Sequence, residues 1–279
     1  ARERGMRICG PNCEGAIYLS KGTWATFLSH PSPKQGDIAL ITHSGGVGEF
    51  LLHKMWERKI GTSAWVSPGN EIDLQVADYI EYFALDRETK ALSIFLETAR
   101  DGQKFIRAAR FAFEQEKPMI VLKVGKSERA RIAAFTHTGA IAGKYGLYLG
   151  LFRQFGIVRA KNLQELVDLP LALAWEPLPS GNRVVVIADS GGMATLLADA
   201  IDQESLVMPD IEQETRAKMA KILPDKARVA NPLDITALVG AKDVPSVLES
   251  LGNMVLHDKT CDILIFGVSY WPESVYLRV

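Results

Sequence analysis

Short runs of apolar, often β-branched residues alternate along the chain with longer stretches whose apolar positions recur every three or four residues. The short runs predict buried strands and the longer stretches predict amphipathic helices, an alternation typical of strand, crossover helix and parallel strand. The expected strands lie at 38–42, 63–66, 92–96, 119–122, 183–188 and 263–268. The expected helices lie near 46–60, 73–84, 102–115, 143–155, 162–175, 191–204, 211–222 and 243–256. We therefore expect an α/β fold with parallel sheets covered on both faces.

The helix expected at 73–84 carries a clear boundary signal. Asp73 is of a residue type that favours the N-cap position, so we expect the helix to begin directly after it. An apolar stripe follows at helical spacing and is expected to face the core. The stripe consists of Val76, Ala77, Ile80, Phe83 and Ala84.

An internal repeat organises the chain. The segment Ile41–Val47, Ile-Thr-His-Ser-Gly-Gly-Val, recurs 146 residues later as Ile187–Met193, Ile-Ala-Asp-Ser-Gly-Gly-Met, and apolar positions of the following helices match at the same offset. Between the copies, Pro177–Asn182 interrupts the pattern with two prolines and a glycine. The repeat predicts two doubly wound domains, each opening with a strand that leads through a glycine turn into a helix.

Each Ser-Gly-Gly turn lies where a predicted strand meets a predicted helix. Glycines let the backbone approach a ligand closely, while the free N–H groups and the dipole of a helix N-terminus attract anions. The candidate phosphate ligands are Ser44, Gly45 and Gly46 in the first copy and Ser190, Gly191 and Gly192 in the second. Glycines that only let the helix pack tightly on its strand are the alternative for either copy. The matching positions of the two copies favour a shared ligand.

His137 and Glu97 are the candidate reactive side chains. Glu97 directly follows the strand expected at 92–96, and His137 lies in a polar segment after the strand expected at 119–122. Because loops at the carboxyl ends of parallel strands line the ligand crevice of an open α/β sheet, both are expected at the same rim as Ser44. A neutral imidazole can attack phosphorus, and a carboxylate bonded to one ring nitrogen leaves the other free. A surface histidine and an ordinary loop carboxylate are the alternative.

Other histidines and basic residues give weaker signals. His43 precedes the first Ser-Gly-Gly turn, but its counterpart in the repeat is Asp189, which argues against a shared role. A basic cluster shortly before His137 either attracts a polyanionic nucleotide or coenzyme or forms a solvated loop. The cluster consists of Lys123, Lys126, Arg129 and Arg131. Neither a phosphate loop nor a dinucleotide fingerprint is present, so we expect any nucleotide to be bound by another domain.

Composition narrows the class of protein. Hydrophobic residues make up 47% and charged residues 23% of the 279 positions, which is typical of a folded globular protein. The 32 Lys and Arg nearly balance the 33 Asp and Glu, so no overall field favours nucleic acid or an anionic membrane. The three cysteines form neither an even disulfide framework nor a zinc site, and no apolar run reaches the ~18 residues of a membrane span. We expect a cytoplasmic protein without a metal site, and a chain that is part of a longer polypeptide.

Several short segments recur in the same order in one known family. They are Gly10–Cys13, Ile41–Gly48, Pro68–Asn70, Glu97 with Asp101–Gly102, His137–Gly143, Ser190–Gly192 and Asn231–Asp234. On these segments the sequence resembles the NDP-forming acyl-CoA synthetases, the group that contains ADP-forming acetyl-CoA synthetase and succinyl-CoA synthetase. The resemblance covers nearly the whole chain, and the order and spacing of the segments make it specific.

The resemblance implies a phosphohistidine mechanism. Acyl-CoA and phosphate form an acyl phosphate, which passes its phosphoryl group to a histidine and from there to ADP. By similarity His137 is that histidine and Glu97 is its orienting carboxylate, while the helix starts at Ser44 and Ser190 grip the phosphate.

The Gly10–Cys13 turn lies beside the thiol end of coenzyme A in this family. By similarity Asn12 and Cys13 are the candidate CoA-binding residues, and an ordinary buried thiol is the alternative for Cys13.

The family also implies parts that this chain does not contain. A CoA-binding Rossmann domain precedes the Gly10–Cys13 turn, and an ATP-grasp domain or subunit binds ATP or ADP, with Mg²⁺ expected alongside the nucleotide and no site for it on this chain. We therefore interpret residues 1–34 as the tail of the CoA-binding domain and a linker, 35–178 as the first flavodoxin-like domain, which carries the phosphohistidine, and 179–279 as a second, truncated flavodoxin-like domain. We expect an oligomer that acts on CoA, phosphate and a small carboxylic acid or its acyl-CoA.

Two other functions stay open on sequence grounds. A regulatory module, such as part of a protein acyltransferase, would keep the fold to sense CoA or acyl-CoA without turnover, although the retained His137 argues against it. A flavin-binding role is the third option. The family often has a glycine after the orienting glutamate, whereas Thr98 stands here and crowds the loop without removing the acid. The sequence pattern identifies neither the acyl substrate nor the choice between ADP and GDP.

Overall fold

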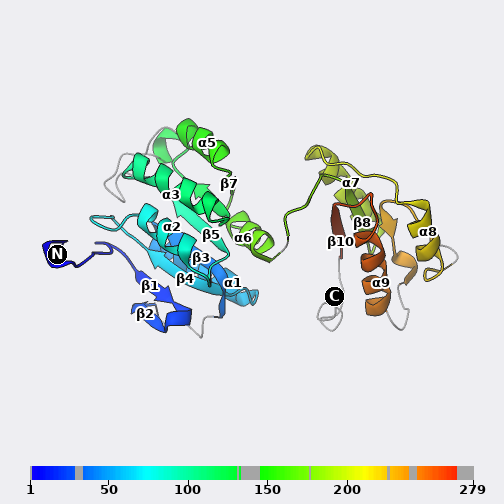
Figure 1. Cartoon of the computed structure of the whole chain (residues 1–279), viewed down its shortest axis with the longest axis horizontal. Coiled ribbons are helices and arrows are strands. Elements are labelled where there is room, and N and C mark those ends of the chain that lie inside the picture. The colour runs from blue at the N-terminus through cyan, green and yellow to red at the C-terminus, as the bar shows by residue number, and fades with distance from the viewer. Residues whose placement is uncertain are drawn as a thin grey trace. The chain divides into compact units, whose positions relative to one another are not determined.

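The computed structural model describes residues 2–28, 34–130, 132, 145–175, 177–224, 227–238 and 244–268. The chain divides into two compact units, Ala1–Pro177 and Leu178–Val279, and each is described by itself (Figure 1).

The described strands of the first unit form a seven-stranded sheet in the order β2-β1-β4-β3-β5-β6-β7. The parallel strands are β3 (Gln35–Thr42), β4 (Thr62–Ser67), β5 (Ala91–Leu96), β6 (Met119–Lys123) and β7 (Val158–Arg159). A hairpin of β1 (Gly15–Tyr18) and β2 (Thr23–Thr26) continues the sheet antiparallel beside β4. The order of the five parallel strands is that of flavodoxin-like doubly wound sheets.

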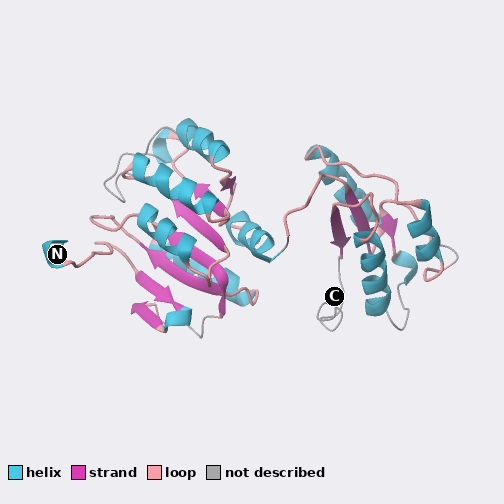
Figure 2. Cartoon of the chain, in the orientation of Figure 1, coloured by secondary structure: helices cyan, strands magenta, loops and turns pink. Residues whose placement is uncertain are grey.

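Helices cover both faces of this sheet, as Figure 2 shows. On one face lie α2 (Val76–Leu85), α3 (Gly102–Glu114) and α5 (Tyr145–Gln154), and on the other lie α1 (Gly45–Glu57) and α6 (Glu165–Trp175). Alternate residues of β3 serve the two cores, with Ala39 and Ile41 on the α2 side and Ile38 and Leu40 on the α1 side. The continuous apolar runs of the sequence therefore arise because each strand is buried on both faces.

The second unit repeats this plan on a smaller scale. Its described strands, β8 (Val184–Ala188), β9 (Leu233–Asp234) and β10 (Ile263–Gly267), form a parallel sheet in the order β10-β8-β9. The first helix, α7 (Gly191–Gln203), packs on one face. The helices α8 (Gln213–Ala220) and α9 (Val244–Leu256) pack on the other face.

These elements confirm the expected α/β class, with one mostly parallel sheet and one parallel sheet. All six expected strands and all eight expected helices are present among the described residues, with ends shifted by at most a few positions. The apolar stripe behind position 73 is buried as expected. The hairpin β1–β2 carried no recognised signal, because two four-residue strands offer too little alternation to read.

The prediction for Asp73 is wrong. The N-cap of α2 is Gln75, which forms a capping box with Asp78. The carboxylate of Asp73 instead accepts hydrogen bonds from Ile8 N at 2.9 Å and Arg7 Nε at 3.0 Å. The Asp73 side chain therefore binds the N-terminal segment, which is distant in the sequence, and does not cap the helix as its residue type predicts.

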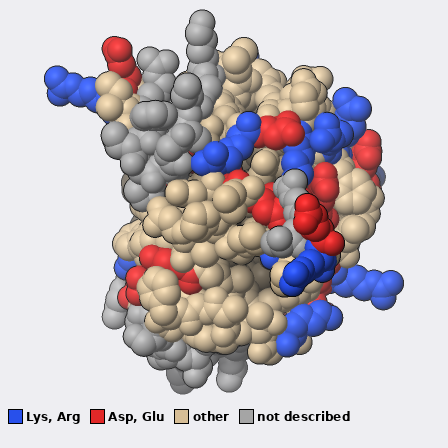
Figure 3. All heavy atoms as spheres, turned by 90° about the vertical axis from the view of Figure 1, so that its left-hand side faces the viewer, with Lys and Arg blue, Asp and Glu red and all other residues tan. Residues whose placement is uncertain are grey.

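Charges of both signs occur together on the face that Figure 3 shows. On the face in Figure 3, basic and acidic side chains are interspersed, in keeping with the formal net charge of −1. None of the described helices is long and apolar enough to span a bilayer.

Candidate functional site

The topological switch of the first sheet lies between β3 and β5. The chain passes from β3 to β4 on one side and returns to β5 on the other, and open α/β sheets bind ligands at the carboxyl ends of strands at such a point. Thr42, which ends β3, is paired with Phe95 of β5. Ser44 and Glu97 therefore leave the sheet at the same edge, as the sequence predicted.

Ser44 is the N-cap of α1. Its hydroxyl accepts a hydrogen bond from Val47 N at 3.4 Å, and the N–H groups of Gly45 and Gly46, which precede Val47, have no acceptor within the helix. No atom of the described residues lies within 4 Å of a Cβ placed on Gly46, so tight packing does not explain this glycine. An outward-facing glycine at a helix start instead suits close approach of an anion.

The first turn of α1 already has a carboxylate beside it. A Cβ placed on Gly45 would overlap the side chain of Glu14, so the Glu14 side chain covers this glycine. Burial and the charge of Glu49 raise the pKa of Glu14 above its ordinary value. An anion that binds over Gly45 must therefore displace or neutralise Glu14.

The two segments Gly10–Cys13 and Pro68–Asn70 lie against one another at the end of β4. Asn70 N donates to Pro11 O at 2.8 Å, and Asn12 Nδ2 donates to Asn70 Oδ1 at 3.3 Å. Gly69 has a φ of +61°, and a Cβ there would overlap the carbonyl oxygens of Pro11 and Asn12. Only glycine fits at position 69. The contact between the Gly10–Cys13 and Pro68–Asn70 segments therefore explains why both motifs are present.

The neighbouring cysteines are free thiols in this turn. Cys13 is partly buried, and its Sγ lies 3.7 Å from Cys9 O. Burial raises the pKa of Cys9, which keeps its thiol protonated and unreactive.

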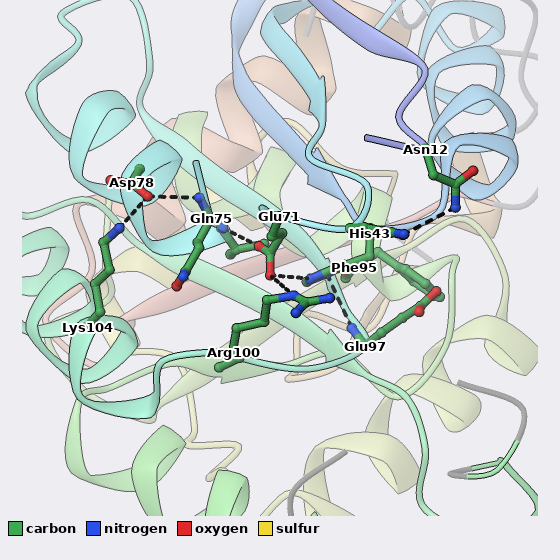
Figure 4. Close-up of polar contacts among 12 residues, drawn as sticks. Asn12, His43, Glu71, Gln75, Asp78, Phe95, Glu97, Arg100 and Lys104 are labelled. Atoms are coloured by element: carbon green, nitrogen blue, oxygen red, sulfur yellow. Dashed lines mark hydrogen bonds and ion pairs between the residues drawn. The ribbon is translucent and has the colours of Figure 1, made fainter. Parts of the chain in front are cut away.

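His43 connects the Ser44 turn to Glu97 (Figure 4). The ring is 3% exposed, and its Nδ1 lies 3.4 Å from both Phe95 O and Glu97 N. Its Nε2 lies 3.5 Å from Glu71 Oε2, an ion-pair distance without hydrogen-bond geometry. If Nδ1 accepts the Glu97 N–H, a neutral ring carries its proton on Nε2, toward the Glu71 carboxylate.

The Glu71 carboxylate is itself held from two sides. Its Oε1 accepts a 2.5 Å hydrogen bond from Val76 N at the start of α2, and Arg100 Nε lies 3.9 Å from Oε2. Glu71 has a φ of +53°, a left-handed conformation that non-glycine residues rarely adopt. Neither His43 nor Glu71 was predicted to belong to the site, because their contacts join residues far apart in the chain.

The basic cluster is not simply a solvated loop. Lys123 ends β6 and is 1% exposed, and its Nζ donates to Glu97 O at 2.7 Å. A pocket at the carboxyl ends of β5 and β6 is lined by Lys123, Lys126 and Lys161, among other residues. The structure thus brings one lysine of the cluster directly to Glu97.

The helix start of the second unit matches that of the first. Ser190 is the N-cap of α7, and its hydroxyl accepts from Met193 N at 3.3 Å. Gly192 is open, whereas a Cβ on Gly191 would lie 3.2 Å from Asp234 Oδ2. A carboxylate thus stands beside this turn as well.

Asn231 explains part of the Asn231–Asp234 motif. Its side chain bonds to Val186 N at 3.0 Å, Val184 O at 2.9 Å and Pro209 O at 2.8 Å. These bonds fix the segment that brings Asp234 to the edge of β8.

His137 lies outside the described residues, as does Arg131. Among the residues that are described, no group of three or more His, Cys, Asp and Glu side chains is arranged to hold a metal ion.

Comparisons with known proteins agree with these motifs. Residues 35–173 match the family described as succinyl-CoA ligase like flavodoxin domain. The chain is 37% identical over 265 residues to the acetate–CoA ligase [ADP-forming] II subunit alpha of Pyrococcus furiosus, covering 95% of this chain and 56% of that protein. It is 35% identical over 281 residues to acetate–CoA ligase [ADP-forming] I of Archaeoglobus fulgidus, covering 100% of this chain and 39% of that one.

A solved structure resembles the whole chain. The dinucleotide forming acetyl-coenzyme A synthetase 1 of Ca. Korarchaeum cryptofilum, in complex with phosphate and ADP, matches with a TM-score of 0.82 and 30% identity. The match covers 100% of this chain and 66% of that one. The chain thus spans between about two fifths and two thirds of the length of these three relatives.

Proposed function

The chain belongs to the NDP-forming acyl-CoA synthetases, and we propose that it supplies the phosphohistidine part of an ADP-forming synthetase. The reaction interconverts a carboxylic acid, CoA and ATP with acyl-CoA, ADP and phosphate. The observation that carries the proposal is the shared edge of β3 and β5, where the Ser44 helix start and Glu97 meet at the switch point.

The proposed steps use the Ser44 helix start and Glu97 at this edge, together with His137, which the family resemblance assigns. Phosphate attacks the thioester carbonyl, CoA leaves as its thiol, and the acyl phosphate remains at the start of α1, where free N–H groups stabilise its charge. A ring nitrogen of His137 then attacks phosphorus, and the carboxylate of the acid leaves. Glu97, bonded to the other ring nitrogen, balances the positive charge that the phosphorylated ring acquires.

The remaining partners are proposed from the family. Ser190, Gly191 and Gly192 bind phosphate in the same way as the first turn, and Asn12 and Cys13 lie at the thiol end of CoA. The nucleotide with its Mg²⁺ binds to an ATP-grasp domain or subunit, and the CoA-binding Rossmann domain precedes residue 35. The two flavodoxin-like domains are 35–178 and 179–279, in a cytoplasmic oligomer.

Turnover by the complete protein, with its nucleotide-binding part, tests this proposal. With ATP, Mg²⁺, CoA and a panel of carboxylic acids, we expect acyl-CoA, ADP and phosphate in equal amounts. His137→Asn abolishes this turnover, whereas His257→Asn, on an exposed histidine of the second unit, preserves it. Formation of AMP and pyrophosphate, or full activity of His137→Asn, contradicts the proposal.

A further inference from the structure

Lys123 is a buried cation at the centre of the candidate site. Burial of an ammonium group is costly unless its hydrogens find acceptors. Its Nζ donates to the main-chain oxygen of Glu97 at 2.7 Å and also to that of Val124. These acceptors are main-chain carbonyls, so the lysine holds the backbone on which Glu97 stands.

Tyr148 of α5 extends this contact. Its ring centroid lies 4.7 Å from Lys123 Nζ, a cation–π distance, and its hydroxyl accepts a hydrogen bond from Ala99 N at 3.0 Å. Tyr148 thus touches the lysine that holds Glu97 and the residue two positions beyond Glu97. Because α5 begins at Tyr145, directly after the segment that carries His137, the same side chain ties that helix to the Glu97 turn.

The opposite side of Glu97 is held by His43. Glu97 N donates to His43 Nδ1 at 3.4 Å, while Glu97 O accepts from Lys123. Hydrogen bonds to both peptide groups that flank a residue fix the direction of its Cα–Cβ bond. The Glu97 carboxylate therefore starts from a backbone that two buried side chains define.

We propose that Lys123 and Tyr148 form a positioning pair that sets the place of the Glu97 carboxylate relative to the helix following His137. This inference rests on the proposed role of Glu97 in phosphoryl transfer. Neither residue touches the reacting atoms, and both act through Glu97. A carboxylate displaced by about 1 Å loses 10- to 100-fold in rate, which sets the size of the effect.

The protonation of Lys123 adds a readout that a purely structural role would not move. Burial lowers the pKa of Lys123 to about 8. The negative charge of Glu97, the charged group that faces it across the sheet edge, acts in the other direction and raises the pKa. Its other neighbour is the Tyr148 ring, and Lys126 stands on its own loop over Tyr145. The ammonium that donates both hydrogen bonds is therefore present below pH 8 and is lost above it.

Lys117 offers a matched control. Its Nζ also donates to two main-chain carbonyls, Asp86 O at 3.1 Å and Thr89 O, but at the opposite edge of the sheet, before β6 begins. In the complete protein, the rate of His137 phosphorylation is measured after rapid mixing with labelled ATP. We expect Lys123→Met to slow it by about 10- to 100-fold and Lys117→Met to leave it within about twofold of wild type.

Two further variants keep the test decisive if Lys123→Met folds poorly. Tyr148→Phe removes only the hydroxyl and is expected to slow labelling severalfold. Lys123→Arg keeps a permanent charge, so the alkaline fall in wild-type rate near pH 8 moves to higher pH. Two results overturn this inference and leave the proposed function standing. One is that Lys117→Met slows labelling as much as Lys123→Met, and the other is that the Lys123 and Tyr148 variants keep wild-type rates and pH profiles. Absence of labelling in the wild type overturns the proposed function and this inference with it.

Discussion

Nδ1 of His43 lies 3.4 Å from the main-chain nitrogen of Glu97, so the residue that precedes the first Ser-Gly-Gly turn also holds the main chain of Glu97, the candidate orienting carboxylate. The two residues are 54 positions apart and directly follow different strands, β3 and β5. The His43 ring thus bonds to the main chain of Glu97, while the main chain of His43 continues into Ser44, so one residue links the carboxyl ends of β3 and β5.

Replacement of His43 tests this connection. His43→Leu leaves the Glu71 carboxylate, with 2% of its side chain exposed, facing an apolar group and removes the acceptor of Glu97 N–H. We expect a loss of about 1–3 kcal/mol in the free energy of unfolding of the first unit. His43→Gln costs less, because its amide offers both an acceptor toward Glu97 and a donor toward Glu71.

Urea denaturation followed by tryptophan fluorescence measures this loss. Trp24, Trp56, Trp65 and Trp175, four of the five tryptophans, belong to the first unit, so the signal reports mainly on it. Equal stability of His43→Leu and wild type would rule out this role of the His43 ring.

We expect Glu14 to make phosphate binding at the Ser44 turn depend on pH. The pKa of Glu14 is higher in the folded protein than in the unfolded chain. As the pH rises through that pKa, the side chain ionises, and only then does its charge lower the stability of the fold and repel an anion over Gly45. We expect Glu14→Gln to tighten phosphate binding about 3- to 10-fold near pH 8, and the gain to shrink toward acid pH.

Calorimetric titration with inorganic phosphate between pH 5 and 8 follows this effect. Glu57→Gln, which removes an exposed carboxylate at the other end of α1, serves as the control and is expected to change little. A gain of the same size at every pH would point away from titration of Glu14.

The open glycines separate the two explanations of the Ser-Gly-Gly turns. A Cβ on Gly46 or Gly192 meets no atom of the described residues within 4 Å, so alanine is expected to keep or slightly raise stability there. If the glycines serve an anion, Gly46→Ala and Gly192→Ala each weaken phosphate binding by about tenfold or more, because the methyl group occupies its approach. Thermal melting and phosphate titration are measured on the same two variants, and unchanged phosphate affinity would count against an anion site at these turns.

The sequence predicted the main elements because their signals are local. The runs at β5 and β6 and the stripe of α2 follow from burial on both faces of one sheet. The sequence did not predict the short hairpin β1–β2, because its strands are specified by pairing with β4 rather than by their own pattern.

The site was only partly predictable for a related reason. Ser44 and Glu97 follow strands directly, so topology alone places them at one edge. His43, Glu71 and Lys123 owe their roles to contacts that cross the sheet. The prediction for Asp73 was wrong because its carboxylate accepts hydrogen bonds from Arg7 and Ile8. Spacing along one chain carries no information about such partners.

The most direct test is the chemical identity of the phosphorylated residue. The complete protein is mixed with ATP labelled at the γ-phosphate, and the labelled peptide is sequenced. We expect an acid-labile, base-stable phosphate on His137, which is released by ADP and is strongly reduced in Glu97→Gln. Label on another residue of this chain, or turnover that continues in a His137→Asn protein without any phosphoenzyme, would refute the phosphohistidine mechanism.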